Sequence, residues 1–387
     1  MTALAMQIPS DRRAGNDRLD LLLGLWRCVL QTEDVALDSN FFDLGGDSLL
    51  AVTLLMEIER TTGRHLPITA IYDAQTVAEQ ALLLADDPPP AFSPLVLLKP
   101  GDGTSALFIF HGIGGTVLEF AKLGKLIDIS GEVYAVQAQG VDGTLPPLDS
   151  LEDMAELYCR VIRQKQPAGP YCLCGYSFGG LTAIEVARRL RDAGEEIALL
   201  FLIDAYAHPV TWPRKSLLKV RLRRLTKVIS SQMSQPFRIA TVLTAAKTII
   251  GKMQRDKTGN PVDAGARKRR WLLNKNPDLP LPLLETRSAA EMGLYRYKPR
   301  HYPGNAVFLK ARYPDPDFPD DPRHVWRKLF KHLKVRVSPG SHLTIINEHA
   351  ADVASHINAC LREAGCAAAQ APATVREAPA LVSTRLV

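Results

Sequence analysis

The sequence Gly-Tyr-Ser-Phe-Gly-Gly at residues 175–180 has the pattern of a nucleophilic serine. It follows the apolar run Tyr171–Cys174 and precedes a stretch with helical periodicity. On a sharp turn between a strand and a helix, G-x-S-x-G lifts the serine hydroxyl above the carboxyl ends of the strands, and the glycines leave room for the strained backbone. The N–H of Phe178, at the start of the helix, could then stabilise an oxyanion. We therefore expect Ser177 to be a nucleophile rather than part of an ordinary turn.

A serine nucleophile needs a base and a carboxylate that orients the base. With this motif the acid should precede the histidine along the chain. Asp204 directly follows the next apolar run, and His342 lies in the loop after the last one. Both residues are therefore expected at the same edge of the sheet as Ser177. Asp315 and Asp317, which follow a later apolar run, are the rival acids.

A second serine, Ser48, closes the string Phe-Phe-Asp-Leu-Gly-Gly-Asp-Ser at residues 41–48. The two glycines permit a tight turn, and Ser48 would then begin a helix, at the positive end of the helix dipole. Its hydroxyl could cap that helix. It could also be the attachment point of a phosphodiester, because helix N-termini tolerate negative charge well. The spacing alone leaves both roles open.

Alternating strands and helices from about residue 94 onward would position Ser177. The apolar runs of strand length are 107–110, 133–136, 171–174, 198–203, 306–309 and 335–337, and helices are expected at 151–163, 181–190, 324–330 and 351–361. Such alternation predicts a mainly parallel sheet covered by helices on both faces, an α/β fold. Between Asp204 and about Leu294 no strand pattern occurs, and amphipathic helices are expected at 217–229 and 237–253.

The N-terminal part is expected to form a separate, all-helical unit. Apolar residues recur there at three- and four-residue spacing from Arg18 to about Ala85. The sequence Asp-Asp-Pro-Pro-Pro at residues 86–90 cannot continue a helix and is typical of an extended linker. Residues 1–16 lack apolar periodicity, and residues 365–387 are rich in alanine and proline, so we expect both ends to be disordered.

Charge is distributed unevenly along the 387 residues, of which 46% are hydrophobic and 23% charged, as in globular proteins. The net charge is +6, yet residues 17–87 hold thirteen acidic and four basic side chains, whereas residues 214–270 hold sixteen basic and two acidic ones. Such asymmetry indicates separate tasks for the two regions, or attraction between them. We therefore do not expect nucleic acid as a partner.

The cysteines and the lengths of the apolar runs indicate the cellular compartment of the protein. None of the six cysteines forms a C-x-x-C pair or a metal-ligand spacing with histidine, so we expect no metal site. Cys172 and Cys174 lie in an apolar run, where cysteine is usually a small core residue. The N-terminus lacks a signal-peptide pattern, and the apolar run 197–203 is far shorter than the roughly 20 residues of a membrane span. We expect a cytoplasmic protein.

The string from Phe41 to Leu49 resembles the phosphopantetheine attachment motif of acyl and peptidyl carrier proteins. The resemblance covers about residues 17–87, a stretch with the size and acidity of such a domain. It implies that Ser48 carries a covalent 4′-phosphopantetheine, which a phosphopantetheinyl transferase attaches.

Residues 94–364 resemble the thioesterase domain that ends nonribosomal peptide and polyketide synthases, an α/β-hydrolase with a helical lid. The matching strings are Phe110–Gly115, Gly175–Gly180, Leu202–Asp204 and Gly340–His342. The resemblance implies that Asp204 is the acid rather than Asp315, and that residues 205–294, approximately, form the lid. It also implies that the N–H of Ile113 is the second oxyanion donor, while His111 shapes the loop.

Together the two resemblances imply a termination enzyme of secondary metabolism. The carrier would deliver an acyl or peptidyl thioester, supplied by upstream synthetase modules, to Ser177 for hydrolysis or cyclisation. One alternative is a proofreading thioesterase that clears other carriers. Another, from a different class, is a protein that binds a membrane or a partner through its basic helices, although a basic amphipathic face is more often a solvated surface. The basic segment could also steer the acidic carrier toward the active site.

Overall fold

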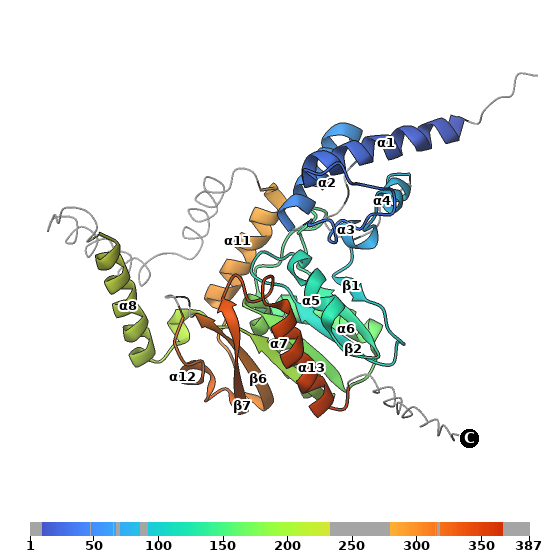
Figure 1. Ribbon diagram of the computed structural model, residues 1–387. Helices are drawn as coiled ribbons and strands as arrows, with labels where there is room; N and C mark the ends of the chain where they lie inside the picture. Colours follow the sequence, from blue (N-terminus) through green and yellow to red (C-terminus); the bar gives the residue numbers. More distant parts are fainter. Residues whose placement is uncertain are drawn as a thin grey trace, which may run out of the picture.

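The computed structural model describes residues 10–46, 48–64, 66, 70–85, 92–232, 279–313, 315 and 318–366. A helical unit comes first along the chain and an α/β unit follows (Figure 1). The helical unit consists of α1 (Ser10–Leu30), α2 (Ser48–Thr62), α3 (Ala70–Asp73) and α4 (Val77–Leu83). Helix α1 begins at Ser10, within the stretch of residues 1–16 that lacks apolar periodicity. Apolar residues are sparse in this first part of the helix, so periodicity could not reveal it.

The helical unit packs around Trp26 of α1, which is fully buried. Its indole and the ring of Phe41 form an edge-to-face pair with centroids 5.2 Å apart. Its Nε1 donates a 2.9 Å hydrogen bond to Oε1 of Gln80, a buried residue of α4. Thr76 and Glu79 form a capping box at the start of α4, each side chain accepting a hydrogen bond from the main chain of the other. The loop before α2 is thereby fixed against the other helices.

The α/β unit is built on a seven-stranded sheet with the strand order β1-β3-β2-β4-β5-β6-β7. Its strands are β1 (Leu95–Lys99), β2 (Ala106–Phe110), β3 (Glu132–Val136), β4 (Tyr171–Tyr176), β5 (Ile197–Ile203), β6 (Tyr302–Tyr313) and β7 (Phe330–Ser341). All neighbouring pairs are parallel except β1 and β3, which are antiparallel. The expected α/β fold with a mainly parallel sheet is confirmed. The chain moves outward from β2 to β3 and then returns to β4, so the direction of winding reverses between β2 and β4.

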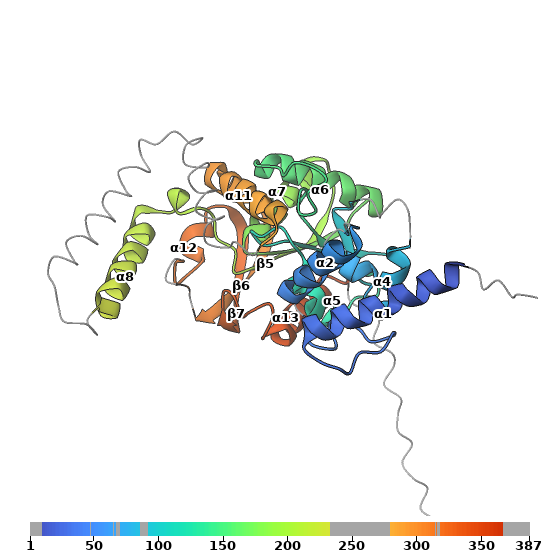
Figure 2. The same ribbon diagram turned by 90° about the horizontal axis from the view of Figure 1, so that it is seen from above.

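Helices cover both faces of this sheet (Figure 2). Those of the α/β unit are α5 (Ala121–Leu126), α6 (Leu151–Lys165), α7 (Phe178–Asp192), α8 (Arg214–Gln232), α11 (Leu281–Arg296), α12 (Arg323–Trp326) and α13 (Ala350–Glu363), with short 3₁₀ turns at Leu118–Phe120 and Pro209–Thr211. On β4, Cys172 and Cys174 face the core shared with α5 and α13, whereas Leu173 between them faces the core shared with α6 and α7. The expectation that both cysteines are core residues is confirmed.

Two elements differ from the sequence-based expectation. The helix expected at residues 324–330 is wrong, because α12 ends at Trp326 and Phe330 already begins β7. Strand β1 was not predicted. Its residues 95–98 are a continuous apolar run, but β1 is an edge strand that pairs only with β3, and only Val96 in it is buried.

The helical unit lies against the β1 side of the α/β unit. Helix α3 contacts β1, and Asp43 pairs with Lys125 of α5 at 3.1 Å. Helix α8, the described part of the basic segment, lies on the side of the α/β unit away from the helical unit in both views (Figures 1 and 2). In this arrangement the basic helix α8 does not face the acidic helical unit. The hypothesis that the basic segment steers the carrier therefore gains no support from the structure.

Helix α8 coincides with the first expected amphipathic helix, and the second, at 237–253, lies outside the described residues. Val220 of α8 is buried, whereas Leu218 and Leu222 are exposed. None of the helices within the described ranges combines the length and apolarity needed to cross a bilayer.

Candidate active site

Ser177 lies on a strained turn between β4 and α7. Its φ of 54° is in the left-handed region, which a serine seldom adopts. The turn is tight enough that a Cβ on Gly175 would lie 2.2 Å from the carbonyl oxygen of Gly179, and a Cβ on Gly179 would lie 2.3 Å from that of Phe110. The main-chain N–H of Ser177 donates to the carbonyl of Ile203 at 2.9 Å. These close approaches explain the glycines of the motif and hold the serine at the carboxyl end of the sheet, beside the point where its winding reverses.

Of the three side chains expected to act together, His342 lies within hydrogen-bond distance of both of the others. Ser177 Oγ lies 3.0 Å from Nε2 of His342, and Nδ1 of His342 lies 2.8 Å from Oδ2 of Asp204. The second carboxylate oxygen of Asp204 accepts the main-chain N–H of Ala311 at 3.2 Å. The side chains of His342 and Asp204 are only 13% and 4% exposed. Asp204 is thus the carboxylate that meets the imidazole, while the rival Asp317 lies outside the described residues.

Strand ends explain why these residues converge. Asp204 follows β5, the strand beside β4, and its N–H donates to the carbonyl of Leu309 on β6. The φ of Asp204 is 45°, so the chain turns sharply there as well. His342 directly follows β7, which pairs with β6. The side chains therefore meet above one edge of the sheet, although they are far apart in sequence.

The two expected oxyanion donors come from adjacent strand ends. Phe178 is the first residue of α7, where main-chain N–H groups have no acceptor inside the helix. Ile113 lies in a turn closed by a 3.1 Å hydrogen bond from Gly115 N–H to the carbonyl of Gly112. That turn follows β2, which pairs in parallel with β4. Ile113 packs against the same hydrophobic core as Phe178.

His111 is buried beside this turn and is held as a structural group. Its Nδ1 lies 2.6 Å from the carbonyl oxygen of Gly112, and its Nε2 lies 2.7 Å from the hydroxyl of Tyr158. Since a carbonyl can only accept, Nδ1 donates and Nε2 accepts the tyrosine proton. Burial lowers the pKa of His111 to about 4, so the ring is neutral at pH 7. Its contacts fix the loop of Ile113, in the way expected from the sequence.

Tyr176, the variable residue of the serine motif, is a site residue that the sequence did not reveal. Its hydroxyl donates a 2.6 Å hydrogen bond to the main-chain carbonyl of His342. Its ring stacks on the imidazole with centroids 5.3 Å apart and an angle of 25° between the planes. The motif gave no signal for this contact, because any residue type can occupy the position.

Glu119 is a second residue that the sequence did not reveal. Its carboxylate accepts the main-chain N–H of Gly112 and lies 3.3 Å from the hydroxyl of Thr116. Burial raises the pKa of Glu119 to about 7. The Glu119 carboxyl therefore helps to hold the loop that carries Ile113.

Ser48 is the first residue of α2, a helix of fifteen residues. The turn before it is closed by a 2.9 Å hydrogen bond from Gly46 N–H to the carbonyl of Phe41, and Gly45 has a φ of 91°. Asp43 and Gly45 of this turn are exposed. An exposed turn leading into the positive end of a helix fits a covalently attached phosphodiester.

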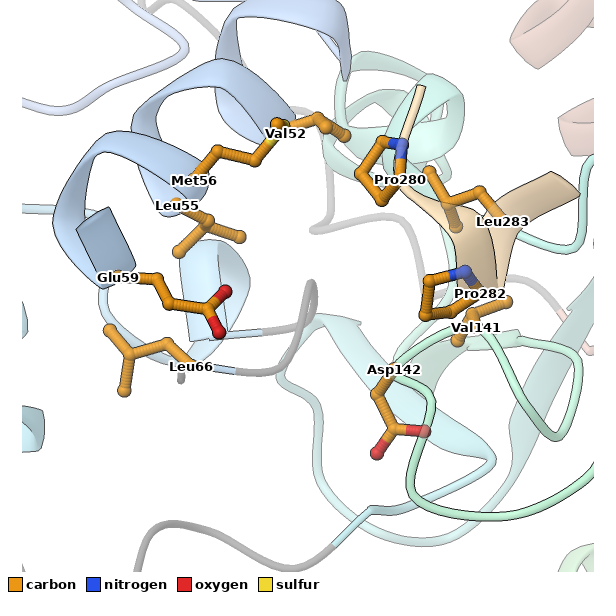
Figure 3. A pocket seen from close by; sticks show the side chains of 10 residues that line it. All are labelled: Val52, Leu55, Met56, Glu59, Leu66, Val141, Asp142, Pro280, Pro282 and Leu283. Atoms are coloured by element: carbon orange, nitrogen blue, oxygen red, sulfur yellow. The ribbon is translucent and has the colours of Figure 1, made fainter. Parts of the chain in front are cut away.

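An apolar hollow of about 230 Å³, open to solvent, lies between the two units (Figure 3). From the helical unit, Val52, Leu55 and Met56 of α2 line it, and from the α/β unit Val141 and Leu283 do. A Cβ on Gly115 would lie 3.0 Å from Cγ1 of Val141. The hollow therefore lies between the helix that Ser48 begins and the part of the α/β unit formed by Val141 and the start of α11.

A mainly parallel sheet with a serine on a strained strand-to-helix turn defines the α/β-hydrolase class. Comparison with known families is more specific. A thioesterase domain family matches residues 105–361, and a phosphopantetheine attachment site family matches residues 20–84. This chain therefore belongs to the thioesterase domain family and carries a phosphopantetheine attachment domain before it, which confirms both resemblances.

Curated relatives are much longer than this chain. It is 34% identical over 182 residues to an indigoidine synthase of Dickeya dadantii, covering 47% of this chain and 12% of that protein. It is 37% identical over 188 residues to a dimodular nonribosomal peptide synthase of Bacillus subtilis, covering 48% of this chain and 8% of that one. The chain thus spans about a tenth of the length of these two relatives.

A solved structure shares the fold. A four-domain nonribosomal peptide synthetase bound to AMP and glycine matches with a TM-score of 0.53 and 24% identity, covering 88% of this chain and 26% of that one. At this identity the likeness shows the fold alone.

Proposed function

We propose that this chain releases an acyl or peptidyl group, held as a thioester on its own carrier unit, through an acyl-enzyme on Ser177. The observation that carries the proposal is the line of hydrogen bonds from Ser177 through His342 to Asp204, at 3.0 and 2.8 Å. Membership of the thioesterase family supports a thioester as the bond that is cleaved.

In the proposed reaction, Nε2 of His342 accepts the proton of Ser177 as Oγ attacks the thioester carbonyl. Asp204 accepts the Nδ1–H, which keeps the lone pair on Nε2 and stabilises the imidazolium. The N–H groups of Phe178 and Ile113 donate to the oxyanion. His342 then returns the proton to the departing sulfur, leaving an acyl ester on Ser177. Water converts this ester to a free acid, and a nucleophile within the acyl group converts it to a cyclic product.

Ser48 is the residue that we propose for attachment of phosphopantetheine, in a carrier domain at residues 17–87. When bound, this group supplies a thiol on a long arm, on which the acyl group is held as a thioester. A phosphopantetheinyl transferase would attach it, and upstream synthetase modules would load it. The thioesterase domain would span residues 94–364, with its lid at about 205–294. Tethering in one chain keeps the effective concentration of substrate high.

The apolar hollow between α2 and α11 supports this transfer within one chain, because there the helix that Ser48 begins faces the α/β unit. A proofreading enzyme that acts on other carriers would have no use for an attachment site of its own. We therefore favour release from the chain's own carrier.

Intact-mass analysis of the full chain tests the proposal. After loading with a phosphopantetheinyl transferase and an acyl-coenzyme A, the unaltered chain should lose its acyl group, while Ser177→Ala should load normally and retain it. Ser48→Ala should gain no mass, whereas Ser39→Ala, in the same unit, should load normally. Release by Ser177→Ala at the normal rate would refute the nucleophile, and loading of Ser48→Ala would move the arm to another residue.

A further inference from the structure

The imidazole of His342 contacts a second aromatic ring besides Tyr176. The ring of Phe318 lies 5.1 Å from it, centroid to centroid, with the planes inclined by 58°. Phe318 is in the connection between β6 and α12, which takes no part in the proposed chemistry. The orientation of His342 therefore depends on where this connection is held.

Two residues hold the segment 318–320 in place. Tyr206, two positions after Asp204, stacks on Phe318 with centroids 4.7 Å apart, and its hydroxyl donates to the carbonyl of Pro319 at 3.4 Å. From the other side, the guanidinium of Arg223 donates to the main-chain carbonyl of Phe318 and pairs with the carboxylate of Asp320. The segment is thus fixed between the loop after β5 and helix α8.

Arg223 lies on the side of α8 that packs against the α/β unit. Val220, three residues earlier and therefore on the same face, is only 4% exposed, and Leu217 also packs against the core. On other faces of the helix, Leu218 and Leu222 are 59% and 53% exposed. The position of Phe318 therefore depends on where α8 packs on the α/β unit, because Arg223 of α8 holds the segment that contains Phe318.

We infer that Arg223 is a positioning residue, which keeps Phe318 against the imidazole of His342 and so keeps Nε2 aligned with Ser177. The inference rests on the proposed function, in which His342 takes the serine proton. It means that α8 must be seated on the α/β unit for the chemical step to proceed at full rate. Arg223 itself touches none of the reacting atoms.

The test compares Arg223→Met with Arg221→Met, an exposed position on the same helix, in the full chain. The readouts are the rate at which a fluorophosphonate labels Ser177, and kcat and KM for an acyl thioester of N-acetylcysteamine. For Arg223→Met we expect labelling and kcat to fall by roughly three- to thirty-fold, the range that coupling through packed side chains carries. KM and Tm should stay close to their original values, and Arg221→Met should match the unaltered chain.

A double-mutant cycle shows whether the effect passes through Phe318. In a Phe318→Ala background, Arg223→Met should cause no further loss, because the ring that it positions is absent. Asp320→Asn, which removes the ion pair and leaves the carbonyl contact, should cause a smaller loss than Arg223→Met. Arg223→Lys should recover part of the rate.

Three results would overturn the inference: unchanged labelling in Arg223→Met, additive losses in the cycle, or a loss that simply follows a lowered Tm. Each of these can occur with the label still on Ser177, and the proposed function would then stand. Labelling that persists in Ser177→Ala would instead refute the proposed function itself.

Discussion

The hydroxyl of Tyr176 donates a 2.6 Å hydrogen bond to the main-chain carbonyl of His342, and the two rings stack at 5.3 Å. The residue immediately before the proposed nucleophile therefore holds the loop of the proposed base. Because Tyr176 ends β4 and His342 follows β7, this contact joins the centre of the sheet to its edge. It fixes the distance between Ser177 and His342 independently of the hydrogen bond between them.

Replacing Tyr176 with Phe tests this role, because it removes the hydroxyl and retains the ring. A neutral hydrogen bond of this kind contributes about 1 kcal/mol, so we expect kcat to fall by roughly three- to ten-fold. KM for a small acyl thioester should change little, since binding of the substrate does not depend on the tyrosine hydroxyl. Steady-state kinetics provide the measurement. A raised KM with normal kcat would instead place Tyr176 in substrate binding.

Asp204→Asn should reduce kcat on the order of 10⁴-fold. The main-chain N–H of Ala311 already donates to one carboxylate oxygen of Asp204. The amide oxygen of the asparagine would keep that contact, so its NH₂ group would face Nδ1 of His342. The imidazole would then carry its proton on Nε2 and could not accept one from Ser177. The matched control is Asp315→Asn, and a comparable loss in that variant would make Asp315 the acid.

Glu119 should make the stability of the protein depend on pH. Burial raises its pKa to about 7 from an ordinary value of 4.5, so the folded state favours the protonated carboxyl. The contribution of Glu119 to the free energy of unfolding is therefore complete below pH 4.5 and is lost as the pH rises through about 7. Relative to Glu119→Gln, the Tm of the unaltered chain should fall over this range and level off above it.

Thermal unfolding from pH 4.5 to 8 measures this difference. Glu348→Gln, at an exposed position, serves as the control for replacing a glutamate by glutamine. Parallel curves for Glu119→Gln and the unaltered chain would show that Glu119 does not titrate differently in the folded state.

The convergence of the site could be predicted from sequence because each residue has a local signal. Ser177 and Asp204 follow the short, buried strands β4 and β5, which are apolar runs in the sequence, and His342 follows the last apolar run, which is part of β7. In a parallel sheet the carboxyl ends of the strands share one edge, so local strand patterns suffice to bring these residues together. Their distances and hydrogen-bond partners required the structure.

The supporting residues had no such signal. Tyr176 and His342 are 166 positions apart, and neither the type nor the spacing of Tyr176 indicates their contact. Phe318 meets His342 from the connection between β6 and α12, and no apolar periodicity predicts such a contact. Strand β1 was also missed, although its apolar run 95–98 is as long as the run 107–110 of the predicted strand β2; it lies at the edge of the sheet, antiparallel to β3.

The pair formed by Asp43 and Lys125 leads to a prediction about contact between the two units. Asp43 lies in the turn before Ser48, and Lys125 is on α5, with their charged atoms 3.1 Å apart. Their side chains are 71% and 47% exposed, so the pair should contribute no more than about 1 kcal/mol and weaken with salt. Lys125→Glu should therefore slow release from the loaded carrier at low ionic strength by at most about five-fold, because like charges then face each other.

Single-turnover release from the loaded full chain measures this effect, and turnover of a small soluble thioester is the control that should not change. Exchanging the charges, with Asp43→Lys and Lys125→Asp together, should restore release toward the original rate, because attraction between the same two positions is re-established. If the exchanged pair were as slow as Lys125→Glu alone, the contact between Asp43 and Lys125 would have no part in presenting the carrier to the thioesterase.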